Sequence, residues 1–279
     1  MSYKVIIDSC GEFVKEWKED ERFVSAPLTL EVEGEQIIDD ESFDQASFLE
    51  KVKRSPHAPK SACPSPEVYR KYFEGEEERA YAITLSAELS GSYNSAVLGM
   101  QMAKEAKPQK PMHVFNSKSA SIGETLIGLK IVECENAGMT FEETVACVEA
   151  YIEEQNTYFV LENLETLRKN GRLSNLKALV ATALKIKPIM GSTPEGKICQ
   201  LDQARGMNKA LVKMADHLIE KVTDAENKIL AISHCNSPQK AVMLRDAILE
   251  KITVKDCIIL DTAGVSSMYA NDGGIIMVI

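Results

Sequence analysis

The sequence predicts an α/β protein whose first half contains a mostly parallel sheet. Short apolar runs there alternate with amphipathic segments of helical spacing, and this alternation indicates strands joined by crossover helices. The pattern changes near residue 155, after which two apolar runs flank the turn-rich stretch 191–196, typical of a hairpin. We therefore expect a domain boundary there, and the 279 residues suffice for two ordinary domains.

In the first half, strand and helix signals follow one another in order. The predicted strands are Val5–Ile7, Pro27–Val32, Ala80–Leu85 and Met112–Phe115. The predicted helix starts are a capping box of Ser42 and Gln45 before 43–52, Ser65-Pro66 as N-cap and N1 before 68–73, a start after Ser92, and a capping box of Thr140 and Glu143. Gly138 is a natural residue to follow the end of the preceding helix.

In the second half, a hairpin is followed by alternating helices and strands. Its predicted elements are hairpin strands Ile186–Met190 and Lys197–Leu201, a helix striped by Met207, Leu211, Met214 and Leu218, a strand at Ile229–Ser233, a helix starting at Ser237-Pro238, and strands Cys257–Leu260 and Gly274–Ile279. No internal repeat or low-complexity linker interrupts them.

The composition limits the classes of partner and the cellular compartment that we expect. The formal charge is −10 and no basic tract is long, so a nucleic-acid partner is not expected. No apolar run approaches the roughly 20 residues of a membrane span, so we expect no stable membrane insertion. Seven scattered cysteines without a CxxC pair, and a Met1 that leads directly into a strand, predict reduced thiols in the cytoplasm.

Familiar catalytic signatures are missing from the sequence. It contains no HExxH, no GxxxxGK[ST] phosphate loop, no GxSxG elbow and no Cys/His metal spacing. Its four histidines are far apart along the chain. We therefore expect no metal, no cofactor and no catalytic residue, although missing motifs do not exclude an enzyme.

Three hydroxyl-rich turns follow predicted strands or precede predicted helices. They are 61–66, 84–92 and 116–121. Ligands of open parallel sheets bind beyond the carboxyl ends of the strands, where helix N-termini present free N–H groups. Serine hydroxyls add donors without a formal charge, so these turns are suited to a carboxylate or a phosphate; each serine taken alone is more often a helix cap.

Many segments, in this order, resemble the DegV family of bacterial fatty-acid-binding proteins. They are Asp8-Ser9, Pro27-Leu28, Ser61-x-x-Pro64-Ser65-Pro66, Leu89–Ala96, Ser117-x-x-x-Ser121-x-Gly123, Leu161–Leu164, Leu167–Ser174, Ile186–Ile189, Arg205 and Lys209-Ala210. The resemblance implies a three-layer α/β/α N-terminal domain with a mostly parallel sheet over 1–155. It also implies a C-terminal α/β domain with a mixed sheet over 156–279, and a long apolar tunnel between the two.

The resemblance further implies that the tunnel holds a long-chain fatty acid whose carboxylate is bound by hydroxyls. Ser61 stands where relatives have a threonine, and the second hydroxyl maps to Ser90 or to Ser92. In relatives, a partner kinase converts the bound fatty acid to an acyl phosphate for phospholipid synthesis. Tyr269 stands where many relatives carry a head-group histidine.

Three further side chains are candidates for the head group or for partner docking. Arg172 and Arg205 could attract an anion or dock a kinase, and their alternative is a solvated surface position. His234 follows a strand and could face the cleft or serve a structural role. Asp8 is expected to cap a turn at a strand end.

Two other classes of function stay open. One is a stand-alone serine esterase or acyl-phosphate phosphatase using Ser61 or Ser90, which would need an adjacent base. The other is a non-catalytic lipid sensor. Turnover of acyl phosphate or aryl esters would identify the first, and a kinase recovered by pull-down would separate a carrier from a sensor.

Overall fold

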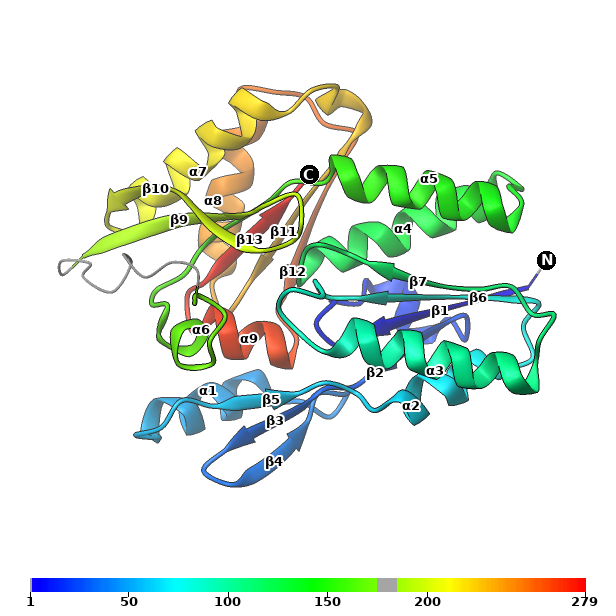
Figure 1. The fold of residues 1–279 in the computed structure, drawn as a ribbon. Coiled ribbons are helices and arrows are strands. Elements are labelled where there is room, and N and C mark those ends of the chain that lie inside the picture. The colour runs from blue at the N-terminus through cyan, green and yellow to red at the C-terminus, as the bar shows by residue number, and fades with distance from the viewer. Residues whose placement is uncertain (1, 175–184) are drawn as a thin grey trace.

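The computed structural model describes residues 2–174 and 185–279, and it contains three sheets (Figure 1). The sheet of the first half has the order β2-β1-β6-β7, and all its strand pairs are parallel. Its strands are β1 (Tyr3–Asp8), β2 (Phe23–Ala26), β6 (Arg79–Thr84) and β7 (Met112–Asn116). The short 3-10 helix η1 (Lys15–Glu19) lies between β1 and β2.

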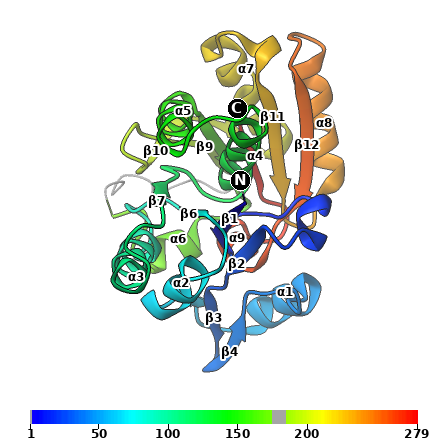
Figure 2. The same ribbon diagram turned by 90° about the vertical axis from the view of Figure 1, so that its right-hand side faces the viewer.

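Helices cover both faces of this parallel sheet (Figure 2). They are α2 (Pro66–Phe73) and α3 (Ser92–Ala106) on one face, and α4 (Ile122–Asn136) and α5 (Phe141–Glu154) on the other. The predicted three-layer α/β/α arrangement is confirmed. The capping box of Thr140 and Glu143 is present, and Ser65 and Pro66 take the predicted N-cap and N1 positions.

The second half forms a six-stranded mixed sheet of order β10-β9-β8-β13-β11-β12. Its strands are β8 (Thr157–Val160), β9 (Ile186–Ser192), β10 (Ile198–Arg205), β11 (Ile229–His234), β12 (Asp256–Asp261) and β13 (Ile275–Val278). Only the β11–β12 pair is parallel among the described strands of this sheet. The predicted hairpin is the antiparallel β9–β10 pair, so the mixed sheet is confirmed.

Helices α7 (Met207–Lys221) and α8 (Pro238–Leu249) cover one face of the mixed sheet. The other face receives α4, because Ile122 and Leu126 of that helix pack against Ala231 and Val278. Helix α4 therefore lies between the two large sheets and is buried nearly all round. Two more helices, α6 (Glu165–Lys169) and α9 (Gly264–Ala270), lie at the boundary of the halves, and η3 (Ala225–Asn227) precedes β11.

A third, antiparallel sheet of order β4-β3-β5 was not anticipated from the sequence. It consists of β3 (Thr29–Val32), β4 (Glu35–Ile38) and β5 (Lys60–Ala62), with α1 (Gln45–Arg54) beside it. The predicted strand Pro27–Val32 belongs to this small sheet, while the preceding β2 joins the parallel one. The pattern of apolar runs does not indicate which sheet a strand joins, because strand pairing depends on tertiary contacts.

The predicted capping box of Ser42 and Gln45 is wrong. The N-cap of α1 is Asp44, whose carboxylate accepts from the Ser47 amide at 3.0 Å. The side-chain amide of Gln45 instead donates hydrogen bonds to the Asp261 carboxylate and to the Thr262 carbonyl, shortly before α9. Helix α5 ends at Glu154 and β8 begins at Thr157, and the domain division at 155/156 stays a prediction.

Candidate functional site: an apolar cavity between the two halves

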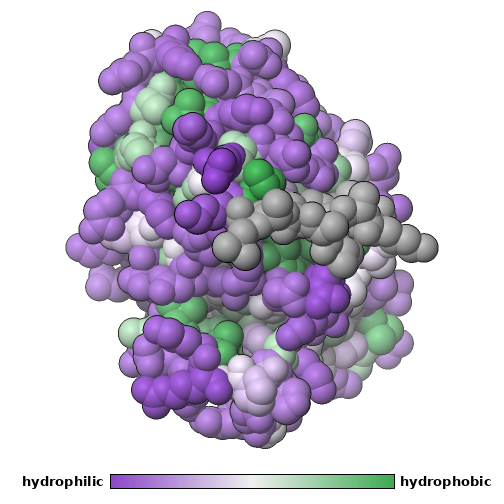
Figure 3. Space-filling model, turned by 90° about the vertical axis from the view of Figure 1, so that its left-hand side faces the viewer, coloured by the Kyte–Doolittle hydropathy of each residue, from purple (hydrophilic) through white to green (hydrophobic). Residues whose placement is uncertain are grey.

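An elongated cavity of about 840 Å³, including its open mouth, lies between the halves. Most of its wall is apolar, contributed by Leu28, Leu85, Leu89 and Ala120 from the first half and by Phe159, Leu161, Ile198, Val265 and Ile276 from the second. In Figure 3, hydrophobic residues are visible between the upper and lower parts of this face, and others lie on the upper and lower parts themselves.

Four hydroxyl groups of this wall are already hydrogen-bonded to the protein. Ser119 Oγ and Thr157 Oγ1 are 2.6 Å apart, and Ser266 donates to the Cys10 carbonyl at 2.9 Å. Ser121 donates to Glu12 at 2.7 Å. Because these hydroxyls have partners, this part of the wall suits a hydrocarbon chain.

Polar groups with spare donors gather at one end of the cavity. Ser61 Oγ, from β5, is 3.2 Å from Tyr269 Oη, from α9, so one of these two hydroxyls keeps a free proton. Ser90 accepts from the Ser92 amide at 3.2 Å, which leaves its own proton free. Ser61, Ser90 and Tyr269 line the cavity, whereas Ser92 does not. Ser61 was predicted in a turn before a helix; it lies in a strand of the small sheet and still reaches this end.

Arg172 lines the same end of the cavity. Its Nε donates to the Leu89 carbonyl at 3.1 Å and its Nη1 to the Asn170 carbonyl at 2.6 Å. The guanidinium lies 5.8 Å from the centre of the Tyr269 ring. Within residues 2–174 and 185–279 no carboxylate forms an ion pair with Arg172, so its charge is available to an anion.

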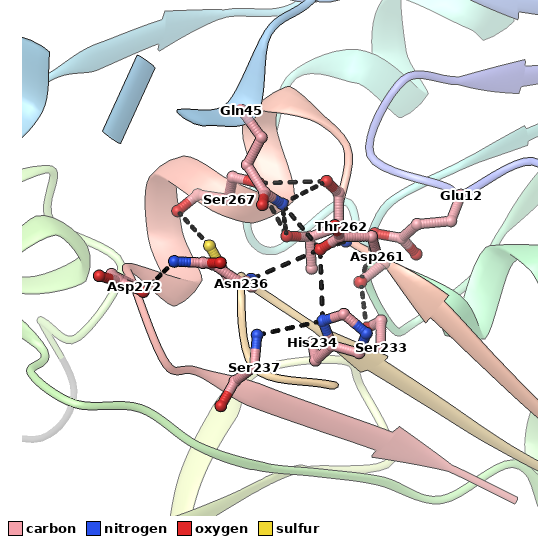
Figure 4. Close-up of polar contacts among 12 residues, drawn as sticks. Glu12, Gln45, Ser233, His234, Asn236, Ser237, Asp261, Thr262, Ser267 and Asp272 are labelled. Carbon is pink, nitrogen blue, oxygen red and sulfur yellow. Dashed lines mark hydrogen bonds and ion pairs between the residues drawn. The ribbon is translucent and has the colours of Figure 1, made fainter. Parts of the chain in front are cut away.

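Ser92, Arg205 and His234 do not line the cavity. Ser92 is fully buried and donates to Asp8 Oδ2 at 2.6 Å. Arg205 is exposed at the end of β10. His234 accepts from the Ser237 amide at 3.3 Å, at the start of α8, and lies 3.3 Å from Asp261 (Figure 4). Burial lowers the pKa of His234, which fits a neutral ring in a structural position.

Asp39 joins the halves and was missed by the sequence reasoning. Its carboxylate accepts from the Gly264 and Val265 amides, each at 2.7 Å, and from the Ser9 hydroxyl at 2.9 Å. It therefore caps the start of α9, the helix that carries Tyr269. An aspartate that follows a strand within a short acidic run gives no sequence signal for a contact 225 residues away.

A second feature missed from the sequence is a set of buried acidic side chains behind the cavity. Ligand-type atoms of Asp8, Cys10 and Glu124 all lie within 4.8 Å of one another. These three are the residues, among those described, that could approach a metal together. Asp8 was expected only to cap a turn. Its carboxylate accepts a hydrogen bond from the Cys10 amide at 3.1 Å, which agrees with that expectation.

Fold and cavity together define the class: a two-domain α/β protein with an apolar interdomain tunnel that ends at hydroxyl donors. The chain belongs to the DegV family, because the model of that family, described as uncharacterised, matches residues 2–278. A DegV domain-containing protein of Streptococcus pneumoniae is 34% identical over 279 residues, covering 99% of this chain and 98% of the relative.

Solved structures agree with this assignment. A DegV family protein of Ruminococcus gnavus, refined with vaccenic acid, is 57% identical with a TM-score of 0.98 and full coverage of both chains. The Fatty Acid Kinase (Fak) B3 protein of Streptococcus pneumoniae, loaded with linoleic acid, is 33% identical with a TM-score of 0.91, covering 100% and 99%. A Eubacterium eligens DegV protein loaded with heptadecanoic acid is 26% identical with a TM-score of 0.90, covering 99% of each chain.

Proposed function

We propose that this protein binds a long-chain fatty acid in the interdomain tunnel. The observation that carries the proposal is an apolar cavity at which hydroxyl groups meet a guanidinium whose partners, among the described residues, are carbonyl oxygens. Each buried CH₂ group of the acyl chain contributes about 0.8 kcal/mol. Affinity therefore comes mainly from the length of chain that the apolar wall covers.

The carboxylate lies at the end formed by Ser61, Ser90, Tyr269 and Arg172. Burying a carboxylate costs several kcal/mol unless donors replace its water. Charge-assisted hydrogen bonds contribute about 1.5–3 kcal/mol each and offset that cost. Between the two serines considered for the second contact, Ser90 is favoured, because the hydroxyl of Ser92 is committed to Asp8.

Relatives support the ligand class and a kinase partner. The proteins of known structure reported above were refined with or loaded with vaccenic, linoleic and heptadecanoic acids. One of them is named a Fatty Acid Kinase (Fak) B3 protein. By extension, this protein acts as a non-catalytic lipid-binding subunit that presents the carboxylate to a kinase for acyl-phosphate formation.

The cytoplasm is the compartment in which we place this role. All seven cysteines are free thiols, which supports a reducing environment. No helix in the described part of the chain combines the length and the hydropathy needed to cross a bilayer.

The stand-alone esterase or phosphatase receives no support from the contacts of the two serines. The described partners of their side chains are Tyr269 for Ser61 and the Ser92 amide for Ser90, with no imidazole among them. A serine nucleophile needs an adjacent base. His234 is engaged with Ser237 and Asp261 instead.

Native mass spectrometry of the protein purified from bacteria tests the proposal. We expect one non-covalent adduct of fatty-acid mass per chain, released on denaturation. A protein that remains free of lipid after gentle purification, and that takes up none from added vaccenic acid, would contradict it. A pull-down that recovers no kinase from a DegV-containing bacterium would favour the lipid-sensor alternative.

A further inference from the structure

Three acidic side chains are buried together where β1, the loop after it, and α4 meet. Asp8 and Glu124 are 0% exposed and Glu12 is 3% exposed. Within the described ranges none of the three forms an ion pair with a lysine, arginine or histidine. Three ionised carboxylates without a cation would be very unfavourable in this apolar interior.

The hydrogen bonds of Asp8 differ from those of Glu124. Asp8 accepts from the Leu85 amide at 3.0 Å, the Ser92 hydroxyl at 2.6 Å and the Cys10 amide at 3.1 Å. Neither carboxyl oxygen of Glu124 receives a donor from the described residues. Asp8 is therefore solvated as an anion, whereas Glu124 is suited to hold a proton and to donate it toward Asp8.

Asp8 also connects to the proposed head-group site. The two donors to its Oδ2, the Leu85 amide and the Ser92 hydroxyl, lie on either side of the turn that carries Ser90. The Ser92 amide in turn donates to Ser90 Oγ at 3.2 Å. The Tyr69 hydroxyl, 2.6 Å from Ser92 Oγ, completes this buried chain of contacts.

We propose that Glu124 is a protonated positioning residue, which donates a hydrogen bond to Asp8 so that Asp8 holds the Ser90 turn in place for the ligand carboxylate. This inference rests on the proposed function. It gives Asp8, Ser92 and Glu124 a role in binding although none of them touches the ligand.

The proton on Glu124 couples ligand binding to pH. Burial raises the pKa of Glu124 well above its usual range, and the neighbouring Asp8 charge raises it further. The titratable groups that face Glu124 are Asp8 on β1 with Cys10 and Glu12 on the following loop, and Tyr69 lies beyond Ser92; none is cationic. Ionisation of Glu124 would place a second negative charge beside Asp8 and displace the turn.

The sign of the stability effect follows from the raised pKa. The folded protein binds the Glu124 proton more tightly than the unfolded chain, so rising pH destabilises the fold between the two pKa values. Glu124→Gln keeps the shape and a donor but has no proton to lose. The unfolding constant of the wild type should therefore increase relative to that of Glu124→Gln as the pH rises above the usual glutamate range, by up to about tenfold per pH unit.

The test compares delipidated wild type with Glu124→Gln, in urea unfolding and in vaccenic acid binding from pH 5 to 9. Glu12, whose pKa burial raises to about 8, is present in both proteins and cancels in the comparison. We expect the affinity of the wild type to fall more steeply than that of the variant as the pH rises above neutral. The proposal would be overturned if the unfolding free energies of the two proteins, or their affinities for vaccenic acid, changed with pH in parallel.

Elemental analysis covers the remaining possibility that a cation neutralises the cluster. One equivalent of a divalent metal in the wild type, lost in Glu124→Gln, would show that Asp8, Cys10 and Glu124 bind that metal, and would also overturn the proposal. If neither protein binds vaccenic acid at any pH, the proposed function fails. The unfolding curves still show whether Glu124 is protonated in the folded protein.

Discussion

Ser61 Oγ and Tyr269 Oη lie 3.2 Å apart although 208 positions separate them in the sequence. The serine comes from the small antiparallel sheet of the first half, and the tyrosine comes from α9 of the second. The pair closes one end of the tunnel with polar groups from both halves. A carboxylate bound there would therefore bridge the halves.

Removing the serine hydroxyls should weaken fatty-acid binding. Ser61→Ala and Ser90→Ala each delete one donor to the carboxylate, worth about 1.5–3 kcal/mol when charge-assisted, or roughly 10- to 150-fold in Kd. Displacement of a fluorescent fatty acid measures the change. Ser47→Ala, on the exposed face of α1, is the matched control and should bind like the wild type. Equal affinities in all four proteins would exclude both serines from the head-group site.

The Tyr269 hydroxyl should contribute without affecting the fold. Tyr269→Phe keeps the ring beneath Arg172 and leaves Ser61 without its hydroxyl partner. We expect a loss of roughly 0.5–1.5 kcal/mol of binding free energy, the usual contribution of a neutral hydrogen bond, with an unchanged thermal midpoint. Calorimetric titration with vaccenic acid measures it; tighter binding by the variant would show that the hydroxyl competes with the ligand for Ser61.

Filling the tunnel should shorten the chain that it accepts. Ile276 of β13 lines the apolar part of the wall, and Ile276→Phe adds volume there. Each CH₂ group excluded from the tunnel costs about 0.8 kcal/mol, so shorter acyl chains should gain relative to longer ones. Mass analysis of the co-purified lipids measures this shift. Val242→Phe, at an exposed position of α8, is the control, and an identical lipid profile for both variants would place the acyl chain elsewhere.

Asp39 should make the contact between the halves sensitive to mildly acidic pH. Burial raises its pKa to about 6 in the folded protein. The folded state therefore binds this proton more tightly than the unfolded chain, and rising pH destabilises it between the two pKa values. Relative to Asp39→Asn, the wild type should lose about 1.4 kcal/mol of unfolding free energy per pH unit from about pH 4 to 6, and nothing more above pH 7. Urea titrations at four pH values measure the difference, and a constant difference from pH 4 to 7 would contradict this assignment.

The sequence predicts well where local patterns determine the structure. The capping box of Thr140 and Glu143, the hairpin around 191–196 and the strand at Ile229–Ser233 follow from residue type and spacing. The family resemblance supplied the tunnel and drew attention to Ser61, Ser90 and Tyr269.

The remaining features depend on tertiary contacts that spacing does not encode. Nothing local to Asp39 indicates that it caps a helix in the other half. Glu124 lies in a helix that is buried because both sheets pack on it, so only the three-dimensional structure shows that no described group donates to its carboxyl oxygens. Ser92 is a donor in the same turn as Ser90, and only the Asp8 contact separates their roles.

A crystal structure of the protein purified from bacteria, with no lipid added, tests the central claim most directly. We expect continuous density of a single acyl chain between the two large sheets, with its carboxylate within hydrogen-bonding distance of Ser61 and Ser90. Density for ordered water alone, or a chain whose carboxylate lies near Ser192 and Gly196 instead, would contradict the account.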